Sequence, residues 1–231
     1  MELILKTVNL TKRFGTQVAV AALSINVRKN SIYGLVGPNG AGKSTILKML
    51  TGSIKPTNGN ICFITETHHK LKIGALIETP ALYKNLTAEE NLLVLVKLLG
   101  LKKSQIHKVL RLVDLENTGR KTVAKFSLGM KQRLGIASAL IGEPNLLILD
   151  EPTNGLDPLN IKKLRDLIKS LPSLGITVII SSHNLNEIQH ITNDICILNG
   201  GLLKYEGKLP DNTNLEDFFL TTLNSKHTGA I

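Results

Sequence analysis

The sequence predicts an α/β fold built around a mainly parallel sheet, and two observations carry this prediction. Apolar runs at 146–149 and 177–180 do not alternate with polar residues, which is typical of strands that helices cover on both faces. A segment with helical period, 158–171, lies between them, and alternation of strand and helix is characteristic of α/β domains. A chain of 231 residues is long enough to bury one core with a subdomain attached to it.

The first third of the chain predicts short strands and one helix. The strands are runs rich in Val, Ile and Leu, broken by charged pairs and by glycine. We assign the earliest runs to an N-terminal antiparallel β subdomain. The elements expected here are strands at 3–10, 19–27 and 32–36, a helix at 43–50, a turn at 56–59, and strands at 61–64 and 73–77.

A helical segment is expected to follow. Thr87 and Glu90 have the spacing of a capping box, and apolar residues then recur with the helical period. We expect a helical subdomain at about 83–140, inserted into a core formed by about 1–82 and 141–209, with a C-terminal tail at 210–231 that frays beyond Leu223. The remaining expected elements are helices at 104–113, 127–140 and 185–191 and strands at 195–198 and 202–205.

The formal charge of +10 is distributed unevenly along the chain. Residues 1–130 carry 19 Lys and Arg against 7 Asp and Glu, whereas residues 131–231 carry 9 against 11. An excess of this kind indicates an anionic partner, which can be a nucleotide, a nucleic acid or a membrane surface, or else a basic face that only meets solvent.

Several classes of protein are excluded by simple counts. The longest apolar stretch, 92–101, is too short to span a membrane and is interrupted by Lys97. Glu2 and Lys6 interrupt the start of the chain where a signal peptide needs an uninterrupted apolar region. Cys62 and Cys196 are too few for a disulfide framework and lack metal-ligand spacing, so we expect two buried cysteines in a soluble protein of the reducing cytosol.

The most specific local motif fits the pattern G-x-x-x-x-G-K-[ST] and lies between an expected strand and an expected helix. Glycines let consecutive backbone N–H groups converge on a phosphate, and the following helix directs its positive dipole end to the same point. The lysine brings a charge to the β- and γ-phosphates, and the serine hydroxyl can ligate Mg²⁺. The motif predicts a P-loop NTPase core that binds a nucleoside triphosphate. Its residues are Gly37, Pro38, Asn39, Gly40, Ala41, Gly42, Lys43, Ser44 and Thr45.

Two adjacent carboxylates, Asp150 and Glu151, end an apolar strand. If this strand ends beside the phosphate loop, Asp150 lies near Mg²⁺ and Glu151 can accept a hydrogen bond from the attacking water. A solvated strand end or a helix cap is the structural alternative. Further along, Asp157 precedes Pro158 as a helix N-cap does, and His183 follows another apolar strand at the edge where α/β sheets bind ligands.

The motifs together point to a family. The order of the phosphate loop, S-x-G-x-K-Q-R-L from Ser127, LLILDEPT around Asp150, GLDP around Asp157, and SSH ending at His183 closely resembles the ATP-binding subunit of ABC transporters. The resemblance covers about 3–209. No N-K-x-D motif of the kind GTPases use for base recognition is present in the sequence.

The resemblance implies a homodimer that forms when ATP binds, with two ATP molecules in the interface. The phosphate loop of one copy and the serine-glycine motif of the other, here Ser127 and Gly129, would hold each ATP. Glu151 would polarise the water, His183 would hold the γ-phosphate, and Asp157 would act across the interface. Phe14 would stack on adenine, although a partly buried core phenylalanine is the alternative for that residue.

Two positions depart from the family pattern. The usual S-G-G-Q is Ser127-Leu128-Gly129-Met130 here, which predicts preserved phosphate contacts and a weaker contact to ribose or partner. Glu78 stands where the family has a glutamine that ligates the metal. Either Mg²⁺ compensates for the extra charge, or like-charge repulsion keeps Glu78 partly protonated, or Glu78 is an exposed loop residue that never reaches the metal.

Glutamate in the context LIETPALYKNLTAEENL resembles a narrower branch, the subunits of bacitracin-resistance and lantibiotic-immunity exporters. The resemblance implies an ATPase that powers export of a peptide antibiotic, with ATP and Mg²⁺ as cofactors. It would lie peripherally on the cytoplasmic face of the membrane and work through separate transmembrane permease subunits, without a nucleic-acid partner. The alternatives are a non-transport ABC-type ATPase that acts on nucleic acid or the ribosome through its basic half, and a P-loop kinase.

Overall fold

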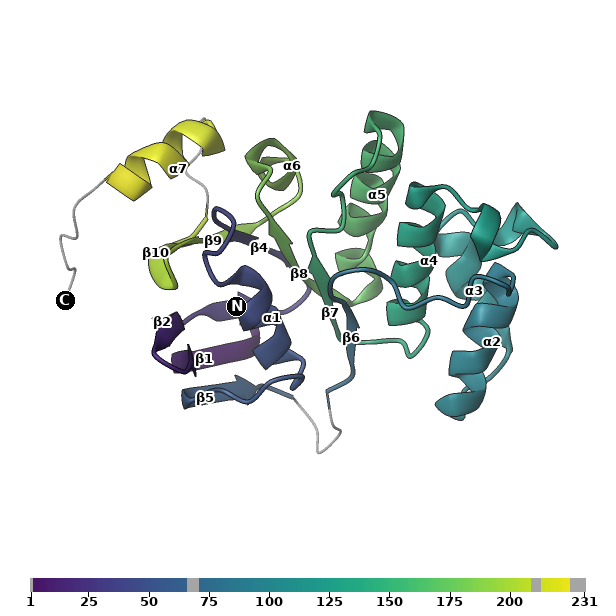
Figure 1. Cartoon of the computed structure of the whole chain (residues 1–231), viewed down its shortest axis with the longest axis horizontal. Coiled ribbons are helices and arrows are strands. Elements are labelled where there is room, and N and C mark those ends of the chain that lie inside the picture. The colour runs from purple at the N-terminus through teal and green to yellow at the C-terminus, as the bar shows by residue number, and fades with distance from the viewer. Residues whose placement is uncertain (1, 66–70, 209–212, 225–231) are drawn as a thin grey trace.

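The computed structural model describes residues 2–65, 71–208 and 213–224. Figure 1 shows two sheets: the smaller one lies against one face of the larger, and most of the helices cover the opposite face. The strands are β1 (Leu3–Phe14), β2 (Gln17–Leu23), β3 (Asn26–Arg28), β4 (Ile32–Val36), β5 (Asn58–Phe63), β6 (Ile73–Leu76), β7 (Leu146–Asp150), β8 (Thr177–Ser182), β9 (Asp194–Asn199) and β10 (Leu202–Gly207). The α-helices are α1 (Lys43–Leu50), α2 (Ala88–Leu98), α3 (Ser104–Leu112), α4 (Leu128–Leu140), α5 (Pro158–Ser170), α6 (Leu185–Gln189) and α7 (Leu215–Asn224), and short 3₁₀ turns lie at Glu116–Thr118, Val123–Lys125 and Pro172–Leu174.

The larger sheet has six strands in the order β10-β9-β4-β8-β7-β6. All neighbouring pairs are parallel except β10 with β9, which form an antiparallel hairpin at one edge. The smaller sheet is antiparallel, because β2, β3 and β5 all pair with the long strand β1. These two sheets confirm the predicted fold class.

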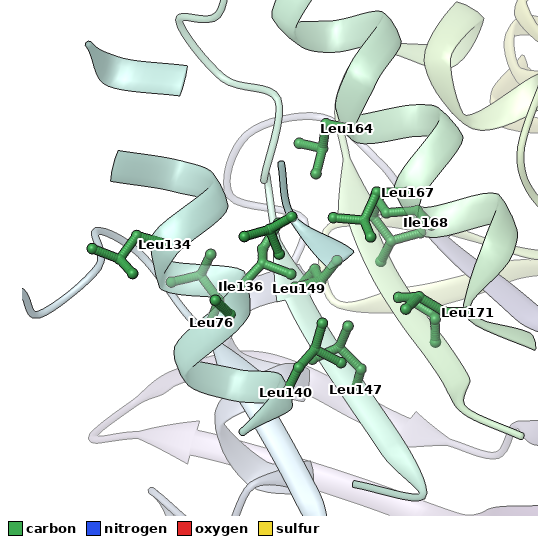
Figure 2. Packing of buried hydrophobic residues seen from close by; sticks show 14 of the residues in the cluster. Leu76, Leu134, Ile136, Leu140, Leu147, Leu149, Leu164, Leu167, Ile168 and Leu171 are labelled. Carbon is green, nitrogen blue, oxygen red and sulfur yellow. The ribbon is translucent and has the colours of Figure 1, made fainter. Parts of the chain in front are cut away.

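The hydrophobic core forms two layers, one on each face of the six-stranded sheet. In β7, Leu147 and Leu149 face one layer while Leu146 and Ile148 face the other, since successive side chains of a strand point to opposite faces. Figure 2 shows α4 and α5 packing on the first layer, and it labels Leu134, Ile136, Leu140, Leu164, Leu167, Ile168 and Leu171 around β7 and Leu76. Helix α1 and the smaller sheet cover the second layer.

Several expected elements differ in extent. Strand β1 continues through the basic pair at 12–13, where register shifts in its pairing with β2 absorb the irregularity. The strand expected at 19–27 is two strands, β2 and β3, separated by a turn. Helix α7 was not expected; its Phe218 ring meets Tyr205 of β10 edge to face at 4.8 Å. The last seven residues of the tail that we expected to fray lie outside the described residues.

The expectation of two buried cysteines was wrong for one of them. Cys196 in β9 is fully buried, and burial raises the pKa of its thiol. Cys62 is exposed on β5, which lies in the smaller sheet and has one face in solvent. In the part of the chain that the structure describes, no helix is both long and apolar enough to cross a bilayer. The boundaries of the helical subdomain stay a prediction.

Candidate nucleotide-binding site

The phosphate loop connects β4 to α1, as the motif predicts. Gly40 and Gly42 have φ of 80° and 100°, in the region that L side chains rarely adopt. A Cβ on Gly42 would lie 2.6 Å from the Ala19 carbonyl oxygen, and one on Gly37 would lie 2.5 Å from that of Leu198, so neither position has room for a side chain. No described side chain caps α1, so the N–H groups of its first turn can bind an anion.

Lys43 is only 6% exposed and lies among oxygen acceptors. Its Nζ donates to the carbonyl oxygens of Gly37 at 2.7 Å and Pro38 at 3.3 Å, and lies 3.2 Å from Glu151 Oε1. The Lys43 ammonium is therefore held against the backbone of the phosphate loop. A phosphate that enters the loop would replace these acceptors with stronger ones.

Glu151 connects Lys43 with His183. It follows β7 in a left-handed backbone conformation (φ 47°), which turns its side chain away from the strand direction. Its Oε2 lies 2.6 Å from His183 Nδ1. Its N–H donates to Ser181 Oγ at 2.9 Å, and Ser181 in turn donates to the buried Asp150 carboxylate. These contacts follow from the parallel pairing of β7 with β8, in which Asp150 stands opposite Ser181.

A cavity of about 650 Å³ lies over the loop and brings most of the predicted residues together. Phe14 stands at its rim, 51% exposed, with Lys12 Nζ 5.1 Å from the ring centroid, so it is not the partly buried core residue that was the alternative. Five lining residues were not predicted, because only folding brings their segments to the loop: Gln17, Val18, Ala19, Asn154 and Gly200. The predicted residues that line it are Phe14, Asn39, Gly40, Ala41, Gly42, Lys43, Ser44, Thr45, Glu151 and His183.

Glu78 does not line this cavity. Its carboxylate, 66% exposed, accepts a hydrogen bond of 2.6 Å from Lys48 Nζ in α1. That hydrogen bond and the lysine charge lower the pKa of Glu78, which is opposite to the partial protonation that we considered. The pKa of Lys48 is raised in turn, first by the hydrogen bond and the charge of Glu78 and to a smaller extent by the charge of Asp150.

The other predicted residues form a second cluster. Ser127 caps α4 by accepting from Met130 N–H at 3.2 Å, and Asp157 caps α5 by accepting from Asn160 N–H at 3.0 Å. A Cβ on Gly129 would touch the Asn160 side chain, so the two helix starts lie side by side. None of Ser127, Gly129 and Asp157 lines the cavity over the phosphate loop of the same chain.

Comparison with known families identifies the chain. The sequence model of the family described as "ABC transporter" matches residues 20–154, which is more than half of the chain. This chain belongs to the ABC transporter family. It is an ATP-binding subunit of that family and an ATPase.

Relatives of this ABC subunit extend over nearly its whole length. It is 51% identical to the bacitracin transport ATP-binding protein BcrA of Bacillus licheniformis over 214 residues, covering 89% of this chain and 70% of that protein. It is 46% identical to the lantibiotic transport ATP-binding protein SrtF of Streptococcus pyogenes over 219 residues, covering 94% and 96%. The predicted branch therefore agrees with these relatives.

Solved structures agree with the fold of this ABC subunit. An ATP-binding subunit of an ABC transporter matches with a TM-score of 0.83 and 29% identity over 96% of this chain and all of that one. A dimeric ATP-binding cassette in a post-hydrolysis state, with ADP and phosphate bound, matches with a TM-score of 0.77 and 26% identity over 89% and 99%. ATP-binding domains of this family thus dimerise.

Proposed function

We propose that this ABC subunit hydrolyses ATP between two copies of itself and thereby powers export of a peptide antibiotic through separate transmembrane permease subunits. The main support is the separation of the site into two clusters. Lys43, Glu151 and His183 meet at one cavity, whereas Ser127 and Asp157 lie together outside it, at the starts of α4 and α5. Two copies arranged head to tail would complete each site with the cluster of the other.

Each residue has a chemical role in this proposal. Lys43 would exchange its carbonyl acceptors for the β- and γ-phosphates. Glu151 would accept a proton from the attacking water, and His183, fixed by its contact with Glu151, would bind the γ-phosphate. Phe14, at the rim, would stack on adenine.

The residues near the loop fit Mg²⁺. Ser44 offers a hydroxyl at the start of α1. Asp150 offers a buried carboxylate, and the hydrogen bond that it accepts from Ser181 fixes its orientation. A bound Mg²⁺ would neutralise charge on the β- and γ-phosphates. We include Glu78 as a third metal ligand, which requires it to leave Lys48.

The class of exported compound comes from the relatives, whose names assign them to bacitracin and lantibiotic transport. A permease partner would hold this subunit peripherally on the cytoplasmic face of the membrane.

Replacing the general base tests both parts of the proposal. Glu151→Gln keeps the shape of the side chain but cannot accept the proton, so we expect hydrolysis to fall at least 100-fold. We also expect ATP to convert the purified variant from monomer to dimer on size exclusion. Cells that express it with its permease should lose resistance to bacitracin or a lantibiotic.

Glu89→Gln, an exposed change on α2, is the matched control and should keep wild-type hydrolysis and wild-type resistance. Wild-type turnover by Glu151→Gln would rule out Glu151 as the base. Turnover by a protein that stays monomeric at every concentration would rule out the shared site. Unchanged resistance with the hydrolysis-dead variant would rule out peptide export.

A further inference from the structure

Leu128, the leucine that departs from the family pattern in the serine-glycine motif, packs against the segment that leads to Asp157. Leu128 is the first residue of α4, and its Cδ2 lies 3.2 Å from the position of a Cβ on Gly155. Gly155 has φ of 74°, a conformation that favours glycine, and it has no side chain to occupy this space. Leu128 thus fills the space above a glycine of the neighbouring segment, while 53% of its surface stays exposed.

Asn160 makes a second contact between the same two segments. Here a side chain of α5 packs against a glycine of α4, whereas Leu128 of α4 packs against a glycine that precedes α5. The three atoms nearest to a Cβ on Gly129 are all from the Asn160 side chain, at 2.5 to 2.9 Å. The same side chain donates from Nδ2 to Asp157 Oδ2, and the Asn160 N–H donates to Asp157 Oδ1. Asn160 therefore touches both the glycine that follows Ser127 and the carboxylate that caps α5.

These reciprocal contacts have no role in the chemistry described so far. Neither Leu128 nor Asn160 lines the cavity over the phosphate loop. Leu128 lies between Ser127 and Gly129, and Asn160 is three residues after Asp157. In the proposed function, Ser127, Gly129 and Asp157 are the residues that one copy presents to the other. Helices α4 and α5 stand next to each other in Figure 1, and these contacts join them at their starts.

We propose that Leu128 and Asn160 are positioning residues that fasten the Ser127–Gly129 turn to the Gly155–Asn160 corner, so that Ser127 and Asp157 reach the partner copy as one unit. This inference rests on the proposed function, because it assumes that both residues act across an ATP-filled interface. A pre-joined pair of segments loses less conformational freedom on association than two independent ones. The leucine that departs from the family pattern is thereby given a role.

Dimer formation in the Glu151→Gln background is the main test. Leu128→Gly restores the glycine that the family has at this position and removes one contact. Asn160→Ala removes the other, and Asn160→Asp keeps its shape while placing a carboxylate against Asp157. With ATP present, half of the background protein is dimeric at a certain protein concentration. We expect each of the three variants to raise that concentration about tenfold. Affinity for ATP at a protein concentration too low for dimers should stay within about twofold, since the cavity is untouched.

Two control variants separate positioning from loss of stability. Leu98→Gly changes an exposed leucine at the last residue of α2, and Lys162→Ala changes an exposed residue of α5. Both should dimerise like the background. Dimerisation of the Leu128 and Asn160 variants at the background concentration would overturn the inference and leave the proposed function intact. Absence of a dimer in the background itself would instead overturn the proposed function.

Melting of a second set of variants tests the contact directly. Gly129→Ala places a methyl group against Asn160, so we expect its melting temperature to fall by several degrees relative to wild type. Adding Asn160→Ala removes the atoms that clash, and the double variant should recover most of that loss. A double variant whose losses simply add would show that the two residues are not in contact and would overturn the inference.

Discussion

The exchange of glutamine for glutamate at position 78 has a local counterpart in Lys48. Ser44 and Lys48 are four residues apart in α1 and share a face of the helix, so the lysine is one turn from the hydroxyl that we assign to the metal. Its ammonium lies 2.6 Å from Glu78 Oε1. The extra negative charge at position 78 is therefore compensated within the protein itself.

This ion pair predicts a defined pH dependence. Lys48 lowers the pKa of Glu78 below its ordinary 4.5, and Glu78 raises the pKa of Lys48 above its ordinary 10.5, in both cases through the hydrogen bond first and the opposite charge second. A lowered carboxyl pKa contributes stability above pH 4.5 that is lost as the pH falls through the folded-state value. A raised lysine pKa contributes stability below pH 10.5 that is lost as the pH rises through the folded-state value.

Lys48→Met should therefore be less stable than the wild type between these limits and should approach it on either side. The free energy of unfolding in urea, measured from pH 3 to pH 11, checks this, and an NMR titration should show a higher pKa for Glu78 in the variant. The effect is small because the pair is exposed. Lys97→Met on α2 is the control. A Glu78 pKa that does not move would contradict the ion pair.

At the scale of elements, local signals predicted helix ends well. The capping box at Thr87 is present in full, with the Thr87 side chain accepting from Glu90 N–H and the Glu90 side chain accepting from Thr87 N–H. Helix α1 occupies the predicted residues. Each of these features depends on side chains within one turn, so the sequence contains the whole cause.

Features that depend on distant partners were missed. The continuation of β1 beyond residue 10 pairs with β2 and β5, and α7 packs against α6 and β10, so neither has a local pattern strong enough to predict it. The site shows the same division. Motif residues were predicted from spacing, whereas Gln17 and Asn154 reach the cavity only because folding brings the start of β2 and the turn after β7 to the phosphate loop.

The packing of α4 against β6 gives a prediction at this scale. A Cβ on Gly74 would lie 2.0 Å from the Ala139 carbonyl oxygen in α4, and that backbone atom cannot yield without moving the helix. Gly74→Ala should lower the free energy of unfolding by about 2 kcal/mol. Gly142→Ala is the matched control, because nothing lies within 4 Å of a Cβ there. Equal stability of the two variants in urea would contradict this packing.

At the scale of the whole molecule, the residues that we propose for catalysis fall into two clusters on one chain. The phosphate-loop cluster lies where β4, β7 and β8 end, and the Ser127 and Asp157 cluster lies at the starts of α4 and α5. The site residues were predicted from the linear order of the motifs. That order could not show that Glu151 bridges Lys43 and His183, because that contact needs the pairing of β7 with β8.

Binding of ATP should stabilise the whole fold. A ligand present at 100 times its Kd and bound only by the folded state adds about 2.7 kcal/mol to the free energy of unfolding. We expect the melting temperature to rise with ATP concentration and this rise to disappear in Lys43→Ala. Lys108→Ala, an exposed residue of α3, should retain it. A full rise in Lys43→Ala would contradict the role of the loop.

The two cysteines differ in a way that matters for experiments. The thiol of Cys196 is enclosed in β9, whereas that of Cys62 lies at the surface of β5. A nitroxide or a fluorophore would therefore attach at one defined place on each copy, without engineering of the sequence. The separation of two nitroxide labels, recorded by pulsed electron spin resonance on samples frozen before and after nucleotide is added, would show whether two copies come together.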